Sequence, residues 1–122
     1  MMYVGTPYSL YEDGLENAFV EAAKVTAELL RRGIPVFSPI THSHPIARYG
    51  NIDPLDHKIW LALDEHMMRA ADALLVIKMP GWEESYGIKH EVAFFEAAHK
   101  MIYYYSWPDL RMETFDEHVK VA

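Results

Sequence analysis

The chain contains no cysteine, which excludes disulfides, thiolate catalysis and cysteine-based zinc sites. It has no apolar run near the ~18 residues that a membrane helix needs, and we expect no secretory signal peptide. Basic residues are also scarce: 11 Lys and Arg stand against 18 Asp and Glu, a formal net charge of −7, so a surface for nucleic acid is not expected. We therefore expect a cytoplasmic protein with no nucleic-acid or membrane partner.

The composition that remains is that of a globular protein. With 122 residues, 51% apolar and 24% charged, we expect one domain spanning residues 1–122. Short apolar runs alternate with segments of helical periodicity, which predicts an α/β fold: a parallel sheet of four to five strands with helices on both faces. The expected strands are 1–5, 34–38, 72–78 and 101–105, and the expected helices are 15–33, 55–71 and 86–99.

The connecting segments complete this prediction. Asp13, three residues before Glu16, has the spacing of a helix N-cap. Residues 39–53 are rich in proline and are expected to form a loop, and residues 106–122 an irregular turn and a short helix. In a parallel sheet, the loops after the strands share the edge where ligands bind. Here those loops are 5–13, 39–53 and 79–85.

Glu91 is the most informative residue. At about 100° per residue, a helix that begins near Tyr86 places Glu91 inside its own apolar stripe. The stripe consists of Ile88, Val92, Phe94, Phe95 and Ala98. A carboxylate there costs several kcal/mol unless it is paired, neutralised or facing a cavity, so its presence suggests a site. The alternative is a glutamate turned to water or paired with a buried lysine.

The helix expected at 55–71 carries a second unusual acid, Asp64. Apolar residues cover more than half of this helix: Ile59, Trp60, Leu61, Leu63, Met67, Met68, Ala70 and Ala71. One sheet face cannot bury all of them, so we expect a homo-oligomer, a dimer or tetramer. Asp64 lies within this arc, either as a site residue or in a surface ion pair with Arg69 or Lys58. Counted from Leu55, Asp64 lies roughly 14 Å along the helix, which is far from the ligand edge.

Several loop residues are candidates for ligand binding. Ser85 can cap the following helix and Gly87 lets its backbone come close, so the first amides face whatever anion is present. Thr6 and Ser9 can add hydroxyl donors. For these serines and the threonine, the alternative is capping alone. Trp82 can stack on a base or a neighbouring subunit, or simply pack within its loop.

Histidines invite a metal hypothesis, but no third ligand accompanies His42 and His44, so we expect no metal and no cofactor. Both can instead touch a substrate at the ligand edge. Tyr103, Tyr104 and Tyr105 are expected to alternate between core and surface rather than form a stacking platform.

Two inward acids on neighbouring helices are the groups needed to cleave a bond to a sugar anomeric carbon. One carboxylate attacks or shields the oxocarbenium-like centre, and the other manages the proton of the leaving group. Three segments carry a resemblance in addition: Tyr3-Val4-Gly5, Asp64 eight residues before Asp72, and Ser85-Tyr86-Gly87 leading to Glu91. From residue 1 to about 105 the chain resembles the nucleoside deoxyribosyltransferase superfamily. That superfamily includes hydrolases of deoxynucleoside 5′-monophosphates. Residues 80–85, Pro-Gly-Trp-Glu-Glu-Ser, are similar to a small bacterial group within it.

The resemblance implies a flavodoxin-like sheet and three catalytic residues. Glu91 would attack the anomeric carbon, Asp64 would act on the base or its leaving nitrogen, and Tyr3 would orient the nucleophile by a hydrogen bond. It also implies that Ser85 helps to hold a 5′-phosphate, which favours a phosphorylated ligand. Gly5, which ends the first strand, is counted with the ligand-binding residues.

The sequence thus predicts cleavage or transfer at the N-glycosidic bond of a nucleoside or nucleoside 5′-monophosphate. Whether water or a second base intercepts the glycosyl-enzyme stays open. The alternatives are a non-catalytic nucleotide-binding module on the same fold and a structural subunit without a ligand.

Overall fold

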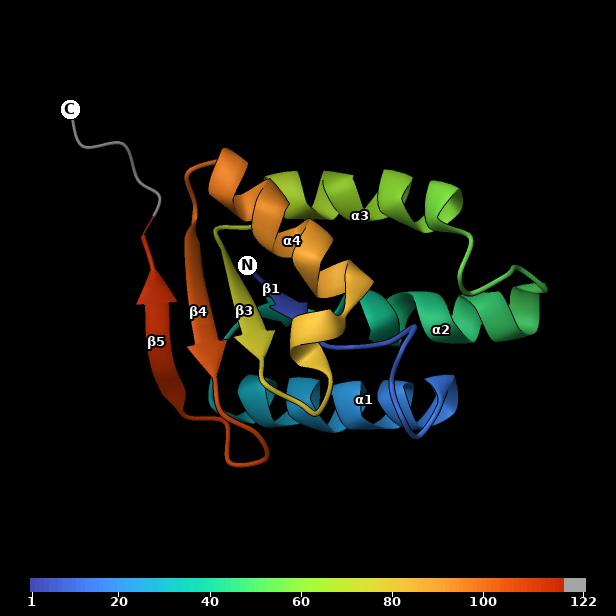
Figure 1. The fold of residues 1–122 in the computed structure, drawn as a ribbon, viewed down its shortest axis with the longest axis horizontal. Coiled ribbons are helices and arrows are strands. Elements are labelled where there is room, and N and C mark those ends of the chain that lie inside the picture. The colour runs from blue at the N-terminus through green and yellow to red at the C-terminus, as the bar shows by residue number, and fades with distance from the viewer. Residues whose placement is uncertain (118–122) are drawn as a thin grey trace.

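The structure, a computed structural model, describes residues 1–117 (Figure 1). Its elements are β1 (Met2–Gly5), α1 (Leu15–Arg31), β2 (Val36–Phe37), α2 (Pro39–Gly50), α3 (His57–Ala70), β3 (Ala73–Ile77), the 3-10 turn η1 (Trp82–Glu84), α4 (Tyr86–Ala97), β4 (Met101–Tyr105) and β5 (Met112–Asp116). They build one sheet of order β2-β1-β3-β4-β5. All neighbouring strands pair in parallel except β4 and β5. The predicted α/β class is confirmed, with a mostly parallel sheet.

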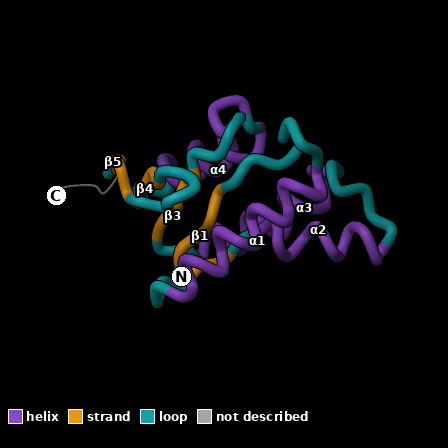
Figure 2. The backbone as a smooth tube through the Cα atoms, turned by 90° about the horizontal axis from the view of Figure 1, so that it is seen from below, coloured by secondary structure: helices purple, strands orange, loops and turns teal. Residues whose placement is uncertain are grey.

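The central strand β3 is buried along its whole length, which explains its continuous apolar sequence Ala-Leu-Leu-Val-Ile. Successive side chains of a strand point to opposite faces. Leu74 and Val76 accordingly join a hydrophobic cluster with Met68 of α3 and Phe95 of α4. Leu75 and Ile77 join a different one with Val25 and Leu29 of α1. Figure 2 shows β1 passing between α4 and α1.

The last parallel strand, β4, carries three consecutive tyrosines that alternate between these two clusters. Tyr104 packs against the cluster of Phe95, whereas Tyr103 and Tyr105 pack against the cluster of Leu29. All three are partly buried. The expected alternation therefore holds for direction, although both sides of this strand are partly covered.

Helix α1 begins and ends at glycines. Gly14 occupies the N-cap position at φ 92°, and Gly33 follows the helix at φ 80°. Both angles lie in the left-handed region that glycine adopts without strain. Asp13 does not cap the helix with its side chain, contrary to expectation. Its backbone carbonyl instead accepts a hydrogen bond of 2.7 Å from Asn17 Nδ2.

Helix α2 replaces the loop expected at residues 39–53. Pro39 stands in its first turn, where a missing N–H costs nothing, and Ser38 Oγ caps it by accepting from Thr41 N at 3.3 Å. Asn51 ends it in the left-handed conformation at φ 55°. Pro45 lies inside the helix, and its fixed φ is compatible with helical backbone although it removes one donor. The proline count was misleading because these prolines occupy a start and a tolerated interior position.

Two further boundaries differ from expectation. Helix α3 begins at His57 rather than near Leu55, with Asp56 at its N-cap position. In the tail, Met112–Asp116 form the edge strand β5 instead of a short helix, because they find an antiparallel partner in β4. The part of the tail prediction that falls on residues 118–122 lies outside the described residues.

The strand order brings the functional segments together. β1 and β3 are parallel neighbours, so the loops that follow them lie at one edge, beside the N-terminal ends of α3 and α4 (Figure 1). None of the helices in residues 1–117 combines the length and apolar character of a membrane span.

Candidate active site

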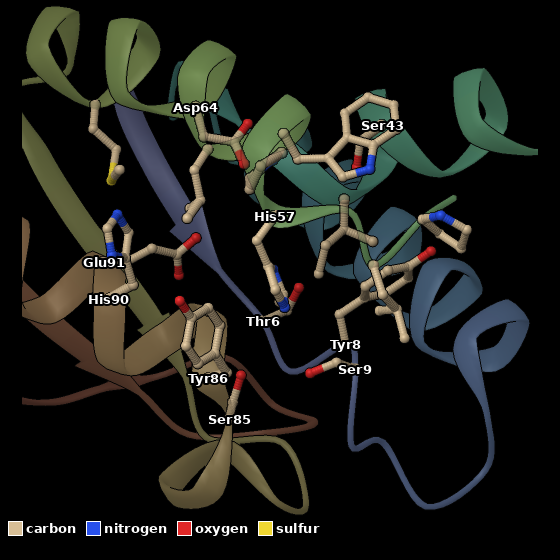
Figure 3. Close-up of a pocket in the computed structure, with 18 of the residues that line it drawn as sticks. Thr6, Tyr8, Ser9, Ser43, His57, Asp64, Ser85, Tyr86, His90 and Glu91 are labelled. Carbon is tan, nitrogen blue, oxygen red and sulfur yellow. The ribbon is translucent and has the colours of Figure 1, made fainter. Parts of the chain in front are cut away.

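A pocket of about 670 Å³, counted to its open mouth, lies at this edge of the sheet (Figure 3). Apolar side chains and a few convergent polar groups line it, which is the character of small-molecule sites. Five segments supply its walls: β1 with its following loop, α2, the loop before α3, α3, and the start of α4. The lining residues are Tyr3, Thr6, Tyr8, Ser9, Pro39, Ile40, Ser43, Pro54, Leu55, His57, Trp60, Leu61, Asp64, Met68, Ser85, Tyr86, Gly87, His90 and Glu91.

Glu91 occupies the closed side of this pocket. It lies in the second turn of α4 and only 8% of its surface is exposed. Its Oε1 atom has no hydrogen-bond partner among the described residues. The glutamate reaches this place because β1 ends in Gly5, where an added Cβ atom would lie 2.7 Å from Glu91 Oε1. Gly5 does not line the pocket; its contribution is the space that the carboxylate fills.

Two other groups act on this carboxylate electrostatically. Burial, and then the charge of Asp64, raise the pKa of Glu91 well above 4.5, while the Tyr3 hydroxyl acts in the opposite direction. Burial raises the pKa of Asp64 to about 6. Burial, followed by the charges of Glu91 and Asp64, raises the pKa of Tyr3, which therefore stays a neutral hydroxyl. The structure thus brings Tyr3, Asp64 and Glu91 into one coupled group.

The position of Asp64 resolves the distance problem raised by the sequence. α3 begins two residues later than expected, at His57, and its residues from His57 to Met68 line the pocket along most of the helix. The helix runs along the pocket rather than pointing at it with one end, so a residue in its second half still faces the ligand space (Figure 3).

Ser85 and Gly87 stand at the N-terminus of α4 and both line the pocket. Ser85 is buried, and its Oγ caps the helix by accepting from Ile88 N at 3.3 Å. The Ser85 carbonyl also accepts from Lys89 N at 3.0 Å. The amides of Tyr86 and Gly87 remain as the donors that this helix end can present to a ligand.

Thr6 and Ser9 lie in the loop after β1 and line the pocket opposite α4. The Thr6 hydroxyl is buried without a hydrogen-bond partner among the described residues. Buried hydroxyls are nearly always paired, so Thr6 Oγ1 is a candidate ligand contact. Ser9 is partly exposed near the mouth.

Trp82 does not line this pocket. Its ring packs 5.9 Å from the Tyr104 ring, with Lys78 Nζ 5.8 Å from its centroid, beside a separate shallow hollow along α4. Gly81 precedes the turn η1 in the left-handed conformation, at φ 84°. Trp82 therefore packs against its own loop and β4, as in the alternative to stacking on a ligand.

The histidines are dispersed. His57 packs against Tyr86, with ring centroids 4.5 Å apart, at the junction of α3 and α4, while His90 Nε2 lies 3.7 Å from Glu65 Oε1. His42 lies near the Phe37 ring, at 5.9 Å, outside the pocket. Within residues 1–117 no cluster of three or more His, Asp or Glu side chains is arranged to hold a metal ion.

Two groups of pocket residues were absent from the sequence prediction. Trp60 and Leu61 were missed because the apolar surface of this helix was interpreted as a subunit contact, and His57 was missed because the histidines were considered chiefly as metal ligands. Tyr8 was missed although it lies between Thr6 and Ser9. No sequence pattern in that loop distinguishes Tyr8 from its neighbours as a pocket residue. Its partner His44 lies outside the pocket, and the Tyr8 hydroxyl and His44 Nδ1 are 2.6 Å apart.

No curated protein matches the chain. A protein-family model does: residues 1–107 match the domain of unknown function DUF1937. The matched residues include β1 to β4, both acids and the helix start at Ser85. On this evidence the chain belongs to the DUF1937 family.

Proposed function

We propose that this protein cleaves or transfers the N-glycosidic bond of a nucleoside or nucleoside 5′-monophosphate. The observation that carries the proposal is the buried carboxylate of Glu91, whose Oε1 atom has no hydrogen-bond partner among residues 1–117, in a pocket that Tyr3 and Asp64 also line. Glu91 is the proposed nucleophile, Asp64 the proton carrier and Tyr3 the residue that orients Glu91.

The proton count of the acid pair supports these roles. Burial of both groups, and the repulsion between their charges, make it costly for the two carboxyl groups to be ionised together, so they can share one proton. In the reaction, ionised Glu91 forms a bond to the anomeric carbon as the carbon–nitrogen bond breaks, and Asp64 gives that single proton to the leaving nitrogen. Developing positive charge on the sugar favours the state with Glu91 ionised and the proton on Asp64. Water or a second base then displaces the sugar from Glu91.

The fold is compatible with this assignment. The order β2-β1-β3-β4 is that of flavodoxin-like sheets, whose ligands bind at the switch point between the first and third strands. The pocket is at the carboxyl ends of β1 and β3. Together with the spacing of Tyr3, Asp64, Ser85 and Glu91, this supports placing the chain in the nucleoside deoxyribosyltransferase superfamily.

The test begins with ligand class and then separates binding from turnover. Nucleosides and their 5′-monophosphates are screened by thermal shift, and those that raise Tm are incubated with protein while free base is measured by chromatography. Glu91→Gln, which keeps the size of the side chain, is expected to retain binding and to release base at least about 10³-fold more slowly. Glu96→Gln, an exposed position on the same helix, is the matched control.

Other outcomes decide against the proposal. A wild-type protein that binds nucleotides but releases no base, alone or with an added second base, is a binding module. A protein whose Tm no nucleoside or nucleotide changes has a different ligand or none.

We also propose that the outer side of α3 contacts a second copy of the chain. Ile59 is 47% exposed and Leu63 is 37% exposed, one helical turn apart. Sedimentation of the wild type and of Ile59→Glu/Leu63→Glu tests this: the wild type should sediment as a dimer or tetramer and the double variant as a monomer. A monomeric wild type at micromolar concentration contradicts it.

A further inference from the structure

A chain of hydrogen bonds runs from the pocket wall to the protein surface through His44. The Tyr8 hydroxyl is 2.6 Å from His44 Nδ1, and His44 Nε2 is 2.8 Å from Glu16 Oε2. Arg48 Nη1 donates to the same Glu16 oxygen at 3.1 Å. The proposed function uses none of these four residues, and Tyr8 is the only one that lines the pocket in residues 1–117.

His44 is held on every side. It is buried, and Phe19 of α1 stacks on its ring with centroids 4.5 Å apart and an interplanar angle of 18°. The Tyr8 ring meets it edge-on at 5.8 Å. Three segments thus fix the imidazole: the loop after β1, α1 and α2. A ring that cannot turn presents each nitrogen to a single partner.

The hydrogen-bond partners determine which atom carries each proton in this series of hydrogen bonds. The hydrogen bond to His44 is the main cause that lowers the pKa of Glu16, so Glu16 is a carboxylate and only accepts. His44 Nε2 must then carry a hydrogen. In the neutral ring Nδ1 has a lone pair, and the Tyr8 hydroxyl donates to it. Burial raises the pKa of Tyr8 to about 12, so Tyr8 keeps its proton at neutral pH.

We propose that His44 is a positioning residue that sets the hydrogen-bonding sense of Tyr8 toward the ligand. While His44 is neutral, the hydroxyl hydrogen of Tyr8 is committed to Nδ1, and the Tyr8 oxygen can only accept from a ligand N–H or O–H. Once His44 is protonated, Nδ1–H donates to Tyr8, whose own hydrogen is released toward the ligand. The charged group in contact with the ring is Glu16, and Arg48 donates to the same Glu16 oxygen.

For a nucleoside, this arrangement selects the base. Tyr8 lies at the opposite end of the pocket from Glu91 (Figure 3). With the anomeric carbon at Glu91, as the proposed function requires, a base that extends away from Glu91 reaches toward Tyr8. A base with an amino group at that edge is then preferred at neutral pH. A base with an acceptor oxygen at that edge is preferred once His44 is protonated.

The test compares 2′-deoxyadenosine with 6-methoxypurine 2′-deoxyriboside. Both keep N1 as a hydrogen-bond acceptor, and they differ at C6 by an amino donor and an oxygen acceptor. Binding is measured by calorimetry at pH 7.5 and 5.5, in a Glu91→Gln background that prevents turnover. We expect deoxyadenosine to bind about fivefold more tightly at pH 7.5, the size of one neutral hydrogen bond, and the ratio to fall at pH 5.5. Tyr8→Phe should remove both the preference and its pH dependence.

Substitution of His44 separates positioning from mere structural support. His44→Gln can still accept from Tyr8 and donate to Glu16, but it cannot be protonated. It should therefore keep the preference at pH 7.5 and lose the change at pH 5.5. Tyr11→Phe, in the same loop but packed in the α1 cluster, and His42→Gln, exposed on the same helix, are the matched controls.

The failures are distinguishable. If neither nucleoside binds, the proposed function fails and this inference with it. If both bind and Tyr8→Phe leaves their ratio unchanged, the inference is overturned and the proposed function stands. A measurement without ligand is also decisive: ring-nitrogen NMR shifts of His44 should report the neutral Nε2–H form, and a neutral Nδ1–H form overturns the inference.

Discussion

The two ends of the pocket differ in whether their polar groups are hydrogen-bonded. At the Glu91 end, the Tyr3 hydroxyl, the Thr6 hydroxyl and Glu91 Oε1 are buried without hydrogen-bond partners among residues 1–117. At the Tyr8 end, every link from Tyr8 through His44 to Glu16 is made. An unpaired buried polar group costs about 1–3 kcal/mol, whereas a paired one is close to neutral or stabilising. The unpaired groups at the Glu91 end therefore lower the stability of the fold, whereas the hydrogen bonds at the Tyr8 end stabilise it.

The largest effect is expected from filling the space behind Glu91. In Gly5→Ala the new Cβ would lie 2.7 Å from Glu91 Oε1, so the carboxylate must move. We expect a loss of about 1–3 kcal/mol in unfolding free energy and a roughly hundredfold loss of base release. Chemical denaturation and turnover assays measure the two. Gly50→Ala, where an added Cβ meets nothing within 4 Å, is the control; it should leave base release unchanged and, as a helical residue, raise stability by no more than about 1 kcal/mol.

The next effect is a pH-dependent gain in stability for Asp64→Asn. The folded pKa of Asp64, about 6, is raised above its usual 3.8 by burial. Between these values the folded protein binds more protons than the unfolded chain, so wild-type stability falls as pH rises through about 4 to 6. The asparagine side chain does not ionise, so the variant does not lose stability in this pH range. We expect the variant to be roughly 1–2 kcal/mol more stable at pH 8, after allowance for partial exposure, and equal to wild type at pH 4.

Thermal unfolding from pH 4 to 8 checks this difference. Glu83→Gln, at an exposed position, serves as the charge-matched control. A constant stability difference between wild type and Asp64→Asn at all pH values would show that Asp64 is not desolvated in the folded state.

A pair of tyrosine substitutions tests the contrast between the two ends directly. Tyr3→Phe removes a hydroxyl that has no geometric hydrogen-bond partner but interacts with Glu91. It should leave stability unchanged or raise it by up to about 1 kcal/mol, while loss of this group beside the nucleophile slows base release roughly tenfold or more. Tyr8→Phe removes a paired hydroxyl and should lower stability by about 1 kcal/mol. Denaturant midpoints give the signs, and two changes of equal sign would contradict the contrast.

The smallest effect concerns a paired polar group far from the chemistry. Lys100 Nζ donates to the carbonyls of Met68, Arg69 and Ala71 at 3.1, 2.8 and 2.6 Å, capping the C-terminus of α3. Lys100→Met keeps the aliphatic stem and loses the cap. We expect about 1 kcal/mol of destabilisation and no change in kcat/KM. A selective loss of activity would indicate that α3 transmits the cap to Asp64.

Much of the local structure followed from local sequence patterns. The 3.6-residue period predicted that Glu91 points inward, and the structure buries it; the Ser85 cap and the end of α1 at Gly33 are also confirmed. The α/β class followed from the alternation of apolar runs and amphipathic segments. These features depend on neighbours within a few residues, which the sequence states directly.

The wrong predictions concern segments whose structure depends on their neighbours and on their exact position more than on their composition. Pro39 and Pro45 suggested a loop, yet Ser38 and Asn51 cap a helix around them. The tail became strand β5 because β4 offered it a partner. Edge strands and proline-containing helices depend on what lies beside them in space, and propensity alone is a weak guide there.

By itself, the sequence determined that an inward-facing acid follows a capped helix start in an α/β chain, because helical periodicity and capping are short-range rules. Only the tertiary structure decided that Tyr8 and His44 meet across 36 positions, and that Gly5 makes room for Glu91. It also turned Trp82 toward Tyr104 and away from the pocket. Contacts between distant segments depend on how strands and helices stack, and no local pattern encodes that stacking.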